Sequence, residues 1–178
     1  VNEPVASGLR ALAVRAGTPL KSVLLAAHLR VLSFLSGEQE VMTGLTTNCR
    51  PECEGGERVL GVFLNTLPLL LPLPNFNNNI DLVRGTLAAE RRLFPHRSFP
   101  MAEIRRLAGG QSLFDSVFNF VHFHVYEAIT RQGGVDVLGY RVWEQTDFPL
   151  ILQASVLPAS DALELVLIAD TALFSAAQ

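Results

Sequence analysis

The order of helical and strand patterns along the chain constrains its fold more than any other feature of the sequence. Apolar residues at helical spacing over 5–16 and 18–36 come before a strand pattern over 40–47. A leucine-rich strand pattern over 67–73 then precedes a third helical pattern over 80–94. Further strand patterns follow at 114–123, 135–142, 148–156 and 163–169. Helices that alternate with strands early, and strands that dominate later, predict a two-layer α/β sandwich with a mixed sheet.

The expected helix ends carry capping residues. Gly17 is a good residue to end the first helix, because glycine adopts the left-handed conformation at little cost. Thr18 and Pro19 predict the start of the second helix, with threonine as the cap and proline in the first turn. The asparagine-rich turn 75–79 predicts a cap for the third helix, and a short amphipathic helix is expected over 101–107.

Length and composition limit the class of protein. A chain of 178 residues is long enough for one domain with its own core. The net charge is −3 and no run of Lys or Arg stands out, which argues against nucleic-acid binding. Prolines interrupt the longest apolar run, 67–73, which is far shorter than the roughly 20 residues that span a bilayer. The start at Val1 lacks a signal-peptide pattern and an initiator methionine, so we expect a cytoplasmic chain cut from a longer one.

The cysteines and histidines do not predict a metal site. Cys49 and Cys53 would need two further ligands, and no histidine lies near them in sequence, so reduced loop thiols are expected. His28 lies on the apolar face of the second helical pattern and is expected to be buried and hydrogen-bonded. His122 and His124 share one face of a strand pattern, without an evident third ligand. Lining a polar channel or bonding across strands is the favoured interpretation for this pair.

No complete catalytic constellation is present in the sequence. A serine in a Gly-x-Ser-x-Gly turn is absent, and the glycine-rich segment 109–112 does not connect a strand to a helix as a phosphate-binding loop would. Asn65, Thr66 and Asn119 interrupt otherwise apolar strand patterns. A buried amide needs hydrogen-bond partners, so each asparagine either bonds to neighbouring backbone or faces a cavity.

Three segments resemble, in order, the late motifs of condensation domains from nonribosomal peptide synthetases. Residues 60–69 (Leu-Gly-Val-Phe-Leu-Asn-Thr-Leu-Pro-Leu) resemble the family motif Gly-x-Phe-Val-Asn-Thr. Residues 95–104 resemble His-Gln-x-x-Pro-Phe-x-x-Ile, with Met101 in place of phenylalanine, and residues 111–120 resemble Asn-Pro-Leu-Phe-Asp-x-x-Phe without the Asn-Pro pair. Residues 23–50 are similar to the helix, turn and strand that precede these motifs. The matched motif positions include Gly61, Phe63, His96, Pro100, Phe114 and Asp115.

The resemblance implies a fold like that of chloramphenicol acetyltransferase, in which two similar α/β lobes enclose a tunnel. The family's His-His-x-x-x-Asp-Gly motif belongs to the N-terminal lobe, and nothing in this chain matches it. Residues 1–178 are therefore expected to be the C-terminal lobe, with no catalytic residue of their own and an apolar surface toward the other lobe that favours association. The segment 123–142 falls where the family has its crossover or floor loop.

The resemblance also implies amide-bond formation between an acyl or peptidyl thioester and an amine. Each substrate would be carried on the phosphopantetheine arm of a peptidyl carrier protein, and the adenylation domain of the same synthetase would be a further partner. Arg50 would pair with the aspartate of the missing motif, since a planar guanidinium suits a bidentate ion pair. Asn65 and Thr66 would line the tunnel, Asn119 would face the substrate, and the histidines near it would line the same tunnel.

Alternative functions are compatible with the same residues. An acyltransferase of this superfamily could use free coenzyme A or form an ester, and a non-catalytic lobe could dock carrier proteins. Epimerisation relatives carry Phe-Asn-Tyr-Leu-Gly where residues 118–122 read Phe-Asn-Phe-Val-His, so amide-forming condensation is favoured.

Overall fold

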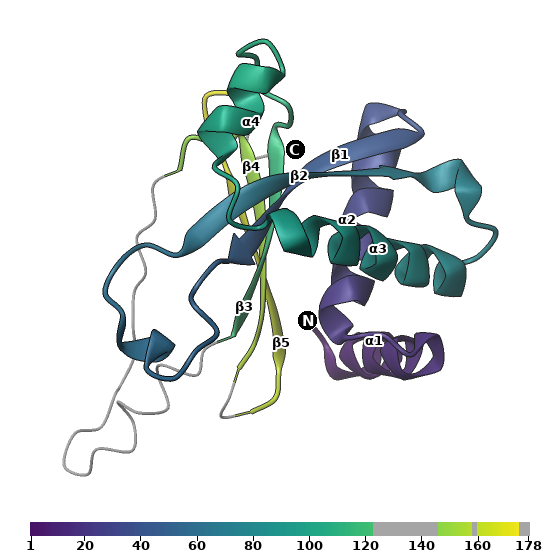
Figure 1. Ribbon diagram of the computed structural model, residues 1–178. Helices are drawn as coiled ribbons and strands as arrows, with labels where there is room; N and C mark the ends of the chain where they lie inside the picture. The colour runs from purple at the N-terminus through teal and green to yellow at the C-terminus, as the bar shows by residue number, and fades with distance from the viewer. Residues whose placement is uncertain (123–145, 158–159, 175–178) are drawn as a thin grey trace.

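A computed structural model describes residues 1–122, 146–157 and 160–174 of the chain (Figure 1). It contains a five-stranded sheet with helices packed against it, which confirms the expected two-layer α/β sandwich with a mixed sheet. The helices are α1 (Glu3–Ala16), α2 (Leu20–Ser36), α3 (Asn79–Leu93) and α4 (Met101–Leu107). The strands are β1 (Glu40–Asn48), β2 (Leu64–Pro72), β3 (Ser116–His122), β4 (Leu150–Val156) and β5 (Leu163–Ala169). Short 3-10 turns lie at Gly56–Arg58, Leu73–Asn75 and Phe94–His96.

The strand order across the sheet is β2-β1-β3-β4-β5. The three central strands β1, β3 and β4 run parallel, and the edge strands β2 and β5 run antiparallel to their neighbours. The carboxyl ends of the central strands therefore meet at one edge of the sheet, which is where open α/β sheets bind ligands.

The helices α1, α2 and α3 cover one face of the sheet (Figure 1). We call this the helix face and the opposite one the open face. The second helix contacts β1 and β3, the third contacts β2, and α4 contacts β2 separately from them. The side chains buried between sheet and helices include Leu25, Leu29, Leu45, Leu69, Leu71 and Phe118.

The helix ends agree with the sequence patterns except at the start of α2. Asn78 caps α3 by accepting a hydrogen bond from the Asp81 backbone N–H at 3.0 Å, and Gly17 ends α1 at φ 65°. The expected threonine cap of α2 is wrong. Pro19 occupies the cap position, its carbonyl accepts from Ser22 N–H, and the buried Thr18 hydroxyl has no hydrogen-bond partner among the described residues. Proline lacks an N–H and already fits this extended position, so the helix begins one residue later.

Two strands differ in length from the sequence prediction. β2 begins at Leu64, so Asn65 and Thr66 lie inside the strand, where they pair with Thr47 and Thr46. β3 spans Ser116–His122 and so begins two residues later than expected, while the strand expected over 135–142 lies outside the described residues.

Crossing a bilayer would require a helix that is both long and apolar. Within the described ranges, no single helix is long and apolar enough to cross a membrane. Helices α1 and α2 together would be long and apolar enough, but they are bent by 107° at their junction.

Candidate functional site

Strand alternation divides the predicted site residues between the two faces of the sheet. In β1, Thr43 lies on the helix face, because its Oγ1 is 3.0 Å from Nε2 of His28 in α2. Gly44 must face the other way, and a Cβ at this glycine would lie 2.7 Å from the methyl carbon of Thr66. Thr66 therefore lies on the open face and its neighbour Asn65 on the helix face. The two residues predicted to line one tunnel wall point in opposite directions.

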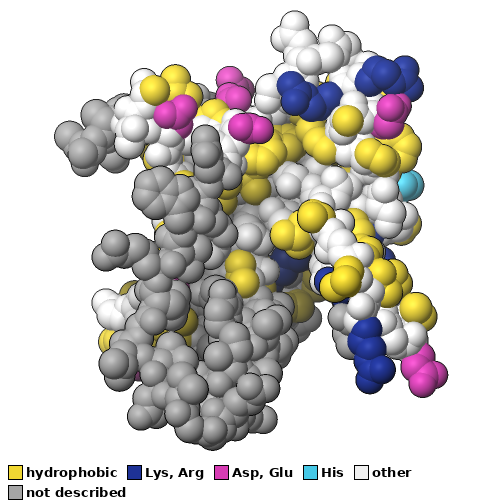
Figure 2. Space-filling model, turned by 90° about the vertical axis from the view of Figure 1, so that its left-hand side faces the viewer, with side chains coloured by type: hydrophobic (Ala, Val, Ile, Leu, Met, Phe, Trp, Pro, Cys, Tyr) yellow, Lys and Arg dark blue, Asp and Glu magenta, His cyan; other side chains and the backbone are white. Residues whose placement is uncertain are grey.

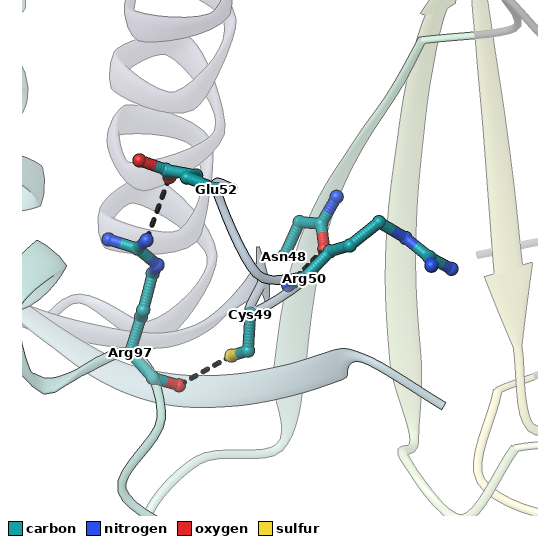
Figure 3. A network of polar contacts seen from close by, with 5 residues as sticks. All are labelled: Asn48, Cys49, Arg50, Glu52 and Arg97. Carbon is teal, nitrogen blue, oxygen red and sulfur yellow. Dashed lines mark hydrogen bonds and ion pairs between the residues drawn. The ribbon is translucent and has the colours of Figure 1, made fainter. Parts of the chain in front are cut away.

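On the helix face, Asn65 holds the connection between α3 and α4. Its Nδ2 donates hydrogen bonds to the carbonyl oxygens of Arg97 at 2.9 Å and Phe99 at 2.7 Å. The Cys49 thiol also donates to the Arg97 carbonyl, at 2.8 Å (Figure 3). These bonds, from β2 and from the residue that follows β1, attach the turn that carries the predicted motif residues His96 and Pro100.

The Arg97 side chain adds a second attachment to the same turn. Its guanidinium pairs with Glu52 at 2.7 Å (Figure 3). It also lies 4.0 Å from the centroid of the Phe94 ring. The Glu52 side chain is 71% exposed, so solvent screens this ion pair and it contributes at most about 1 kcal/mol. The thiol and amide bonds therefore matter more for the position of the turn.

Arg50 is held by the loop that ends in the first motif. Its Nη1 donates to the carbonyls of Gly56 at 3.2 Å and Val59 at 2.7 Å, and the guanidinium lies 4.5 Å from the centroid of the Phe63 ring. In Figure 3 the side chain points away from Cys49 and Arg97.

Gly61 contributes to this arrangement. Its φ is 148°, a region that favours glycine, and a Cβ there would lie 3.4 Å from the Phe63 ring. The spacing of the Gly-x-Phe motif thus permits the aromatic ring to lie beneath the arginine.

The remaining motif residues lie on the open-face side or at element ends. Phe114 is buried, fills the space over Gly44, and stacks on Phe148 at a centroid distance of 5.7 Å. Asp115 is exposed, and its carbonyl accepts from Leu150 N–H at 3.1 Å. His96 is exposed and Pro100 begins α4.

Asn119 lies in the middle of β3, partly buried, and pairs in register with Gln153 of β4. Its neighbour Phe118 faces the helices and lies 5.6 Å from the His28 ring, so Asn119 lies on the open face with Thr66. His122 ends β3, its side chain lies outside the described part of the structure, and so does the whole of His124.

His28 is buried and hydrogen-bonded, as expected from its place on the apolar face of α2. Its Nε2 lies 3.0 Å from Thr43 Oγ1, and the same hydroxyl donates to the Ser116 carbonyl at 3.0 Å. Because Thr43 uses its proton for that carbonyl, it accepts from the histidine N–H. Burial lowers the pKa of His28 to about 4, so the ring is neutral at physiological pH.

A cavity of about 520 Å³ opens at the carboxyl end of β1. Its size falls in the range of small-molecule sites, roughly 300–1,000 Å³. Arg50, Thr47 and Phe120 line it, together with an ion pair between Lys21 of α2 and Glu90 of α3. The sequence patterns did not indicate Lys21 and Glu90, because the two residues are brought together only by the packing of two helices.

The described residues around Arg50 supply hydrogen-bonding and charged groups. Among them, no group of three His, Cys, Asp or Glu side chains could hold a metal ion. His28, whose pKa is about 4, is buried against Thr43 and does not reach a surface. The described residues hold Arg50 in place, present polar side chains on the open face, and line a cavity next to Arg50.

Comparison with known proteins places these features in a family. The chain is 46% identical over 132 residues to the AMB antimetabolite synthetase AmbE of Pseudomonas aeruginosa, covering 72% of this chain and 6% of that protein. It is 29% identical over 178 residues to a linear gramicidin synthase of Brevibacillus parabrevis, covering 98% of this chain and 3% of that protein. The chain thus spans a small part of these relatives.

Solved structures agree in fold. The first condensation domain of the CDA synthetase matches with a TM-score of 0.77 at 18% identity, covering 95% of this chain and 38% of that one. A four-domain nonribosomal peptide synthetase bound to AMP and glycine matches with a TM-score of 0.86 at 18% identity, covering 99% of this chain and 15% of that one. The family model for the condensation domain matches residues 1–178. The chain therefore belongs to the condensation domain family.

Proposed function

We propose that residues 1–178 form the C-terminal lobe of a nonribosomal peptide synthetase condensation domain. The intact domain joins an acyl or peptidyl thioester on one carrier protein to an amine on a second, with each substrate on a phosphopantetheine arm. The lobe covers 38% of a solved condensation domain, and its sequence contains no His-His pair. The catalytic histidine then comes from the part of the domain outside this chain, where it accepts a proton from the attacking amine.

The arrangement of Arg50 carries the proposal. A guanidinium has five N–H donors in one plane, and Nη1 of Arg50 is used by the Gly56 and Val59 carbonyls. Among the described residues, Nε and Nη2 have no hydrogen-bond partner, and the Phe63 ring fixes the guanidinium plane from one side. This leaves an oriented edge for the carboxylate of the other lobe, which would fasten the catalytic loop across the interface.

The open face supplies the wall of the tunnel. Thr66 and Asn119 lie on it and contact the arm or the substrate. Asn65 acts on the tunnel indirectly, by holding the turn at Arg97 and Phe99 from the helix face. The phosphopantetheine is supplied by the carrier proteins, and the adenylation domain loads the acceptor.

The test uses the full condensation domain with its two loaded carrier proteins, and intact-protein mass spectrometry of the product. Wild-type domain should form the amide on the acceptor carrier. Arg50→Lys keeps the positive charge but lacks the planar guanidinium with its paired N–H donors. The rate of product formation should therefore fall about ten- to hundredfold, the effect expected when a hydrogen bond to a charged group is lost. Arg91→Lys, at an exposed position on α3, should leave the rate unchanged.

Two results would contradict the proposal. If turnover with free coenzyme A thioesters equalled turnover with carrier-bound thioesters, the domain would be an acyltransferase that does not need a carrier. A domain that binds carrier proteins but forms no product would be a docking module. Replacement of the upstream histidine would then leave carrier binding unchanged.

A further inference from the structure

The cavity at the carboxyl end of β1 lies on the helix face of the sheet. Two of its lining residues, Leu45 and Phe120, pack in the core between the sheet and the helices. Lys21 in the first turn of α2 and Glu90 near the end of α3 also line it. The proposed tunnel wall lies on the open face with Asn119. The cavity is therefore separate from that wall.

Lys21 and Glu90 form an ion pair at the cavity. Their side chains are only 26% and 18% exposed, so solvent screens this pair less than the pair between Arg97 and the exposed Glu52. The first turn of α2 contains no acidic residue, and the counter-charge of Lys21 comes from α3 instead. A mostly buried charge pair that opens into a cavity can meet the charges of a ligand there.

Both members of the pair have unused hydrogen-bonding capacity. The Lys21 ammonium carries three N–H groups, and among the described residues Glu90 Oε1 is its one acceptor. The other carboxylate oxygen of Glu90, Oε2, accepts no hydrogen bond from the described part of the chain. Two cationic N–H donors and one anionic acceptor therefore lie side by side.

The charges around the cavity are balanced. Its charged lining residues are two cations and two anions, namely Lys21, Arg50, Glu52 and Glu90. The carboxylates would repel a polyanion such as a nucleotide, which offsets its attraction to the cations. A zwitterion, in contrast, can bond to an ammonium and a carboxylate at once and leaves neither charge unpaired.

The contact between Lys21 and Glu90 limits how far apart the charges of the ligand can be. Because the two head groups contact each other, a matching ligand needs its carboxylate and its ammonium close together. An α-amino acid carries both on one carbon atom, whereas a peptide separates its charged ends. The apolar lining favours an apolar side chain, and about 520 Å³ is large enough for such a molecule.

The loop that carries Arg50 forms one wall of this cavity, over residues 50–53. Figure 2 shows the side of the molecule on which the loop lies, and the surface is hollowed near the centre of the view, where Lys or Arg side chains are recessed. Helices α2 and α3 supply the opposite wall. A ligand between these walls contacts both the helices and the loop that holds Arg50 through the Gly56 and Val59 carbonyls.

We propose that this cavity binds a free α-amino acid with an apolar side chain. Lys21 donates hydrogen bonds to the carboxylate of the ligand, and Glu90 accepts one from its ammonium. The bound amino acid fixes the loop that carries Arg50 against α2 and α3. The inference goes beyond the proposed function, because this ligand is not carrier-bound and lies on the face opposite the tunnel wall.

The experiment measures ligand binding to the full condensation domain by isothermal titration calorimetry. The three probes share one side chain: L-phenylalanine, L-phenylalaninamide, which lacks the carboxylate, and N-acetyl-L-phenylalanine, which lacks the ammonium. Wild type should bind L-phenylalanine about tenfold more tightly than either analogue, since each analogue loses a hydrogen bond between charged groups.

Replacement of each charge separates the two contacts. Glu90→Gln keeps the side-chain shape and should weaken L-phenylalanine binding about three- to tenfold, while N-acetyl-L-phenylalanine stays within about twofold. Lys21→Met should weaken L-phenylalanine to the same extent and leave L-phenylalaninamide within about twofold. A general loss of structure would instead weaken all three probes alike, which would contradict the proposal.

A double variant covers the case in which one unpaired charge prevents folding. Lys21→Met combined with Glu90→Leu removes both charges, and such replacements of a buried ion pair are often neutral for stability. The double variant should bind L-phenylalanine about tenfold more weakly than wild type. Unchanged affinity would overturn the proposal.

Two controls locate the ligand. Glu103→Gln removes the carboxylate of an ion pair with Arg106 on α4, outside the cavity, and should leave all three probes unchanged. Asn119→Leu, on the open face, should also leave them unchanged. If Asn119→Leu weakens L-phenylalanine as much as Glu90→Gln does, the ligand lies in the tunnel and the proposal fails.

Binding and turnover are separate readouts. If the wild-type domain forms no amide, the proposed function fails, and calorimetry still decides on the cavity. Absence of saturable binding of both L-phenylalanine and L-leucine to wild type would overturn the assignment of the cavity.

Discussion

The side-chain amide of Asn65 donates a hydrogen bond to the carbonyl of Arg97, 32 residues later in the chain, at 2.9 Å. The same nitrogen also donates to the Phe99 carbonyl at 2.7 Å. An asparagine near the start of a mostly apolar strand therefore connects β2 to the turn between α3 and α4. The interrupted strand pattern is explained by backbone carbonyls that need a donor.

Removal of this amide should destabilise the domain. Asn65→Ala leaves the Arg97 and Phe99 carbonyls without their donor, which should reduce the free energy of unfolding by about 1–3 kcal/mol. Asn65→Asp should cost more, because a carboxylate cannot donate and repels both carbonyl oxygens. Urea unfolding measures both variants against Asn77→Ala, an exposed asparagine. Unfolding midpoints that match the control would show that the connection contributes nothing.

The contact between Phe63 and Arg50 should affect the reaction more than stability. Phe63→Leu removes the ring from beneath the guanidinium, an interaction of about 0.5–1 kcal/mol at a solvent-accessible site. Product formation by the intact domain should fall about two- to fivefold, with a small change in melting temperature. Phe99→Leu, whose backbone carbonyl alone bonds to Asn65, serves as the control. A large fall in melting temperature with unchanged turnover would assign Phe63 to packing only.

Gly44 should not tolerate a side chain. A Cβ at this position would lie 2.7 Å from Thr66 Cγ2 and 2.8 Å from Phe114 Cζ, so Gly44→Ala should cost about 1–3 kcal/mol through overpacking. Gly8 in α1 has no atom within 4 Å of the equivalent position, and Gly8→Ala should be neutral or stabilising. Thermal unfolding compares the two.

The neighbouring ring gives an internal check on Gly44. Phe114→Leu, added to Gly44→Ala, should recover part of the lost stability, since it removes ring atoms near the new methyl group. Additive losses in the double variant would exclude a direct clash.

Folding stability should depend on pH through His28. Burial lowers its pKa in the folded protein to about 4 from 6.5, so between these pH values the unfolded chain binds more protons. The free energy of unfolding should therefore be highest above pH 6.5 and decrease by up to about 3 kcal/mol as the pH falls toward 4. Below that pH the contribution of His28 stays constant.

His28→Gln isolates this contribution, because glutamine cannot be protonated. Urea unfolding at several pH values between 4 and 7 should give a smaller pH dependence for His28→Gln than for wild type. The carboxyl groups affect both proteins alike and cancel in the difference. Identical slopes would show that the folded protein accommodates the charged ring.

Local sequence patterns predicted most elements because helices and strands depend on short-range spacing. The short helix Met101–Leu107 and the strand Leu163–Ala169 match the predicted bounds. Capping was less reliable: Asn78 caps its helix as expected, whereas Pro19 displaces Thr18 from the cap position. The roles that the family resemblance implies for Arg50 and Asn119 stay predictions.

The sequence by itself determined the element types, the α/β class and the resemblance to condensation domains, because periodicity and motif spacing are properties of neighbouring residues. Only the tertiary structure decided that Asn65 and Thr66 face opposite sides, that Thr66 pairs with Thr46, and that Asn119 pairs with Gln153. The physical reason is strand register. Pairing between segments far apart in the chain determines which side chains meet, and no local pattern contains that information.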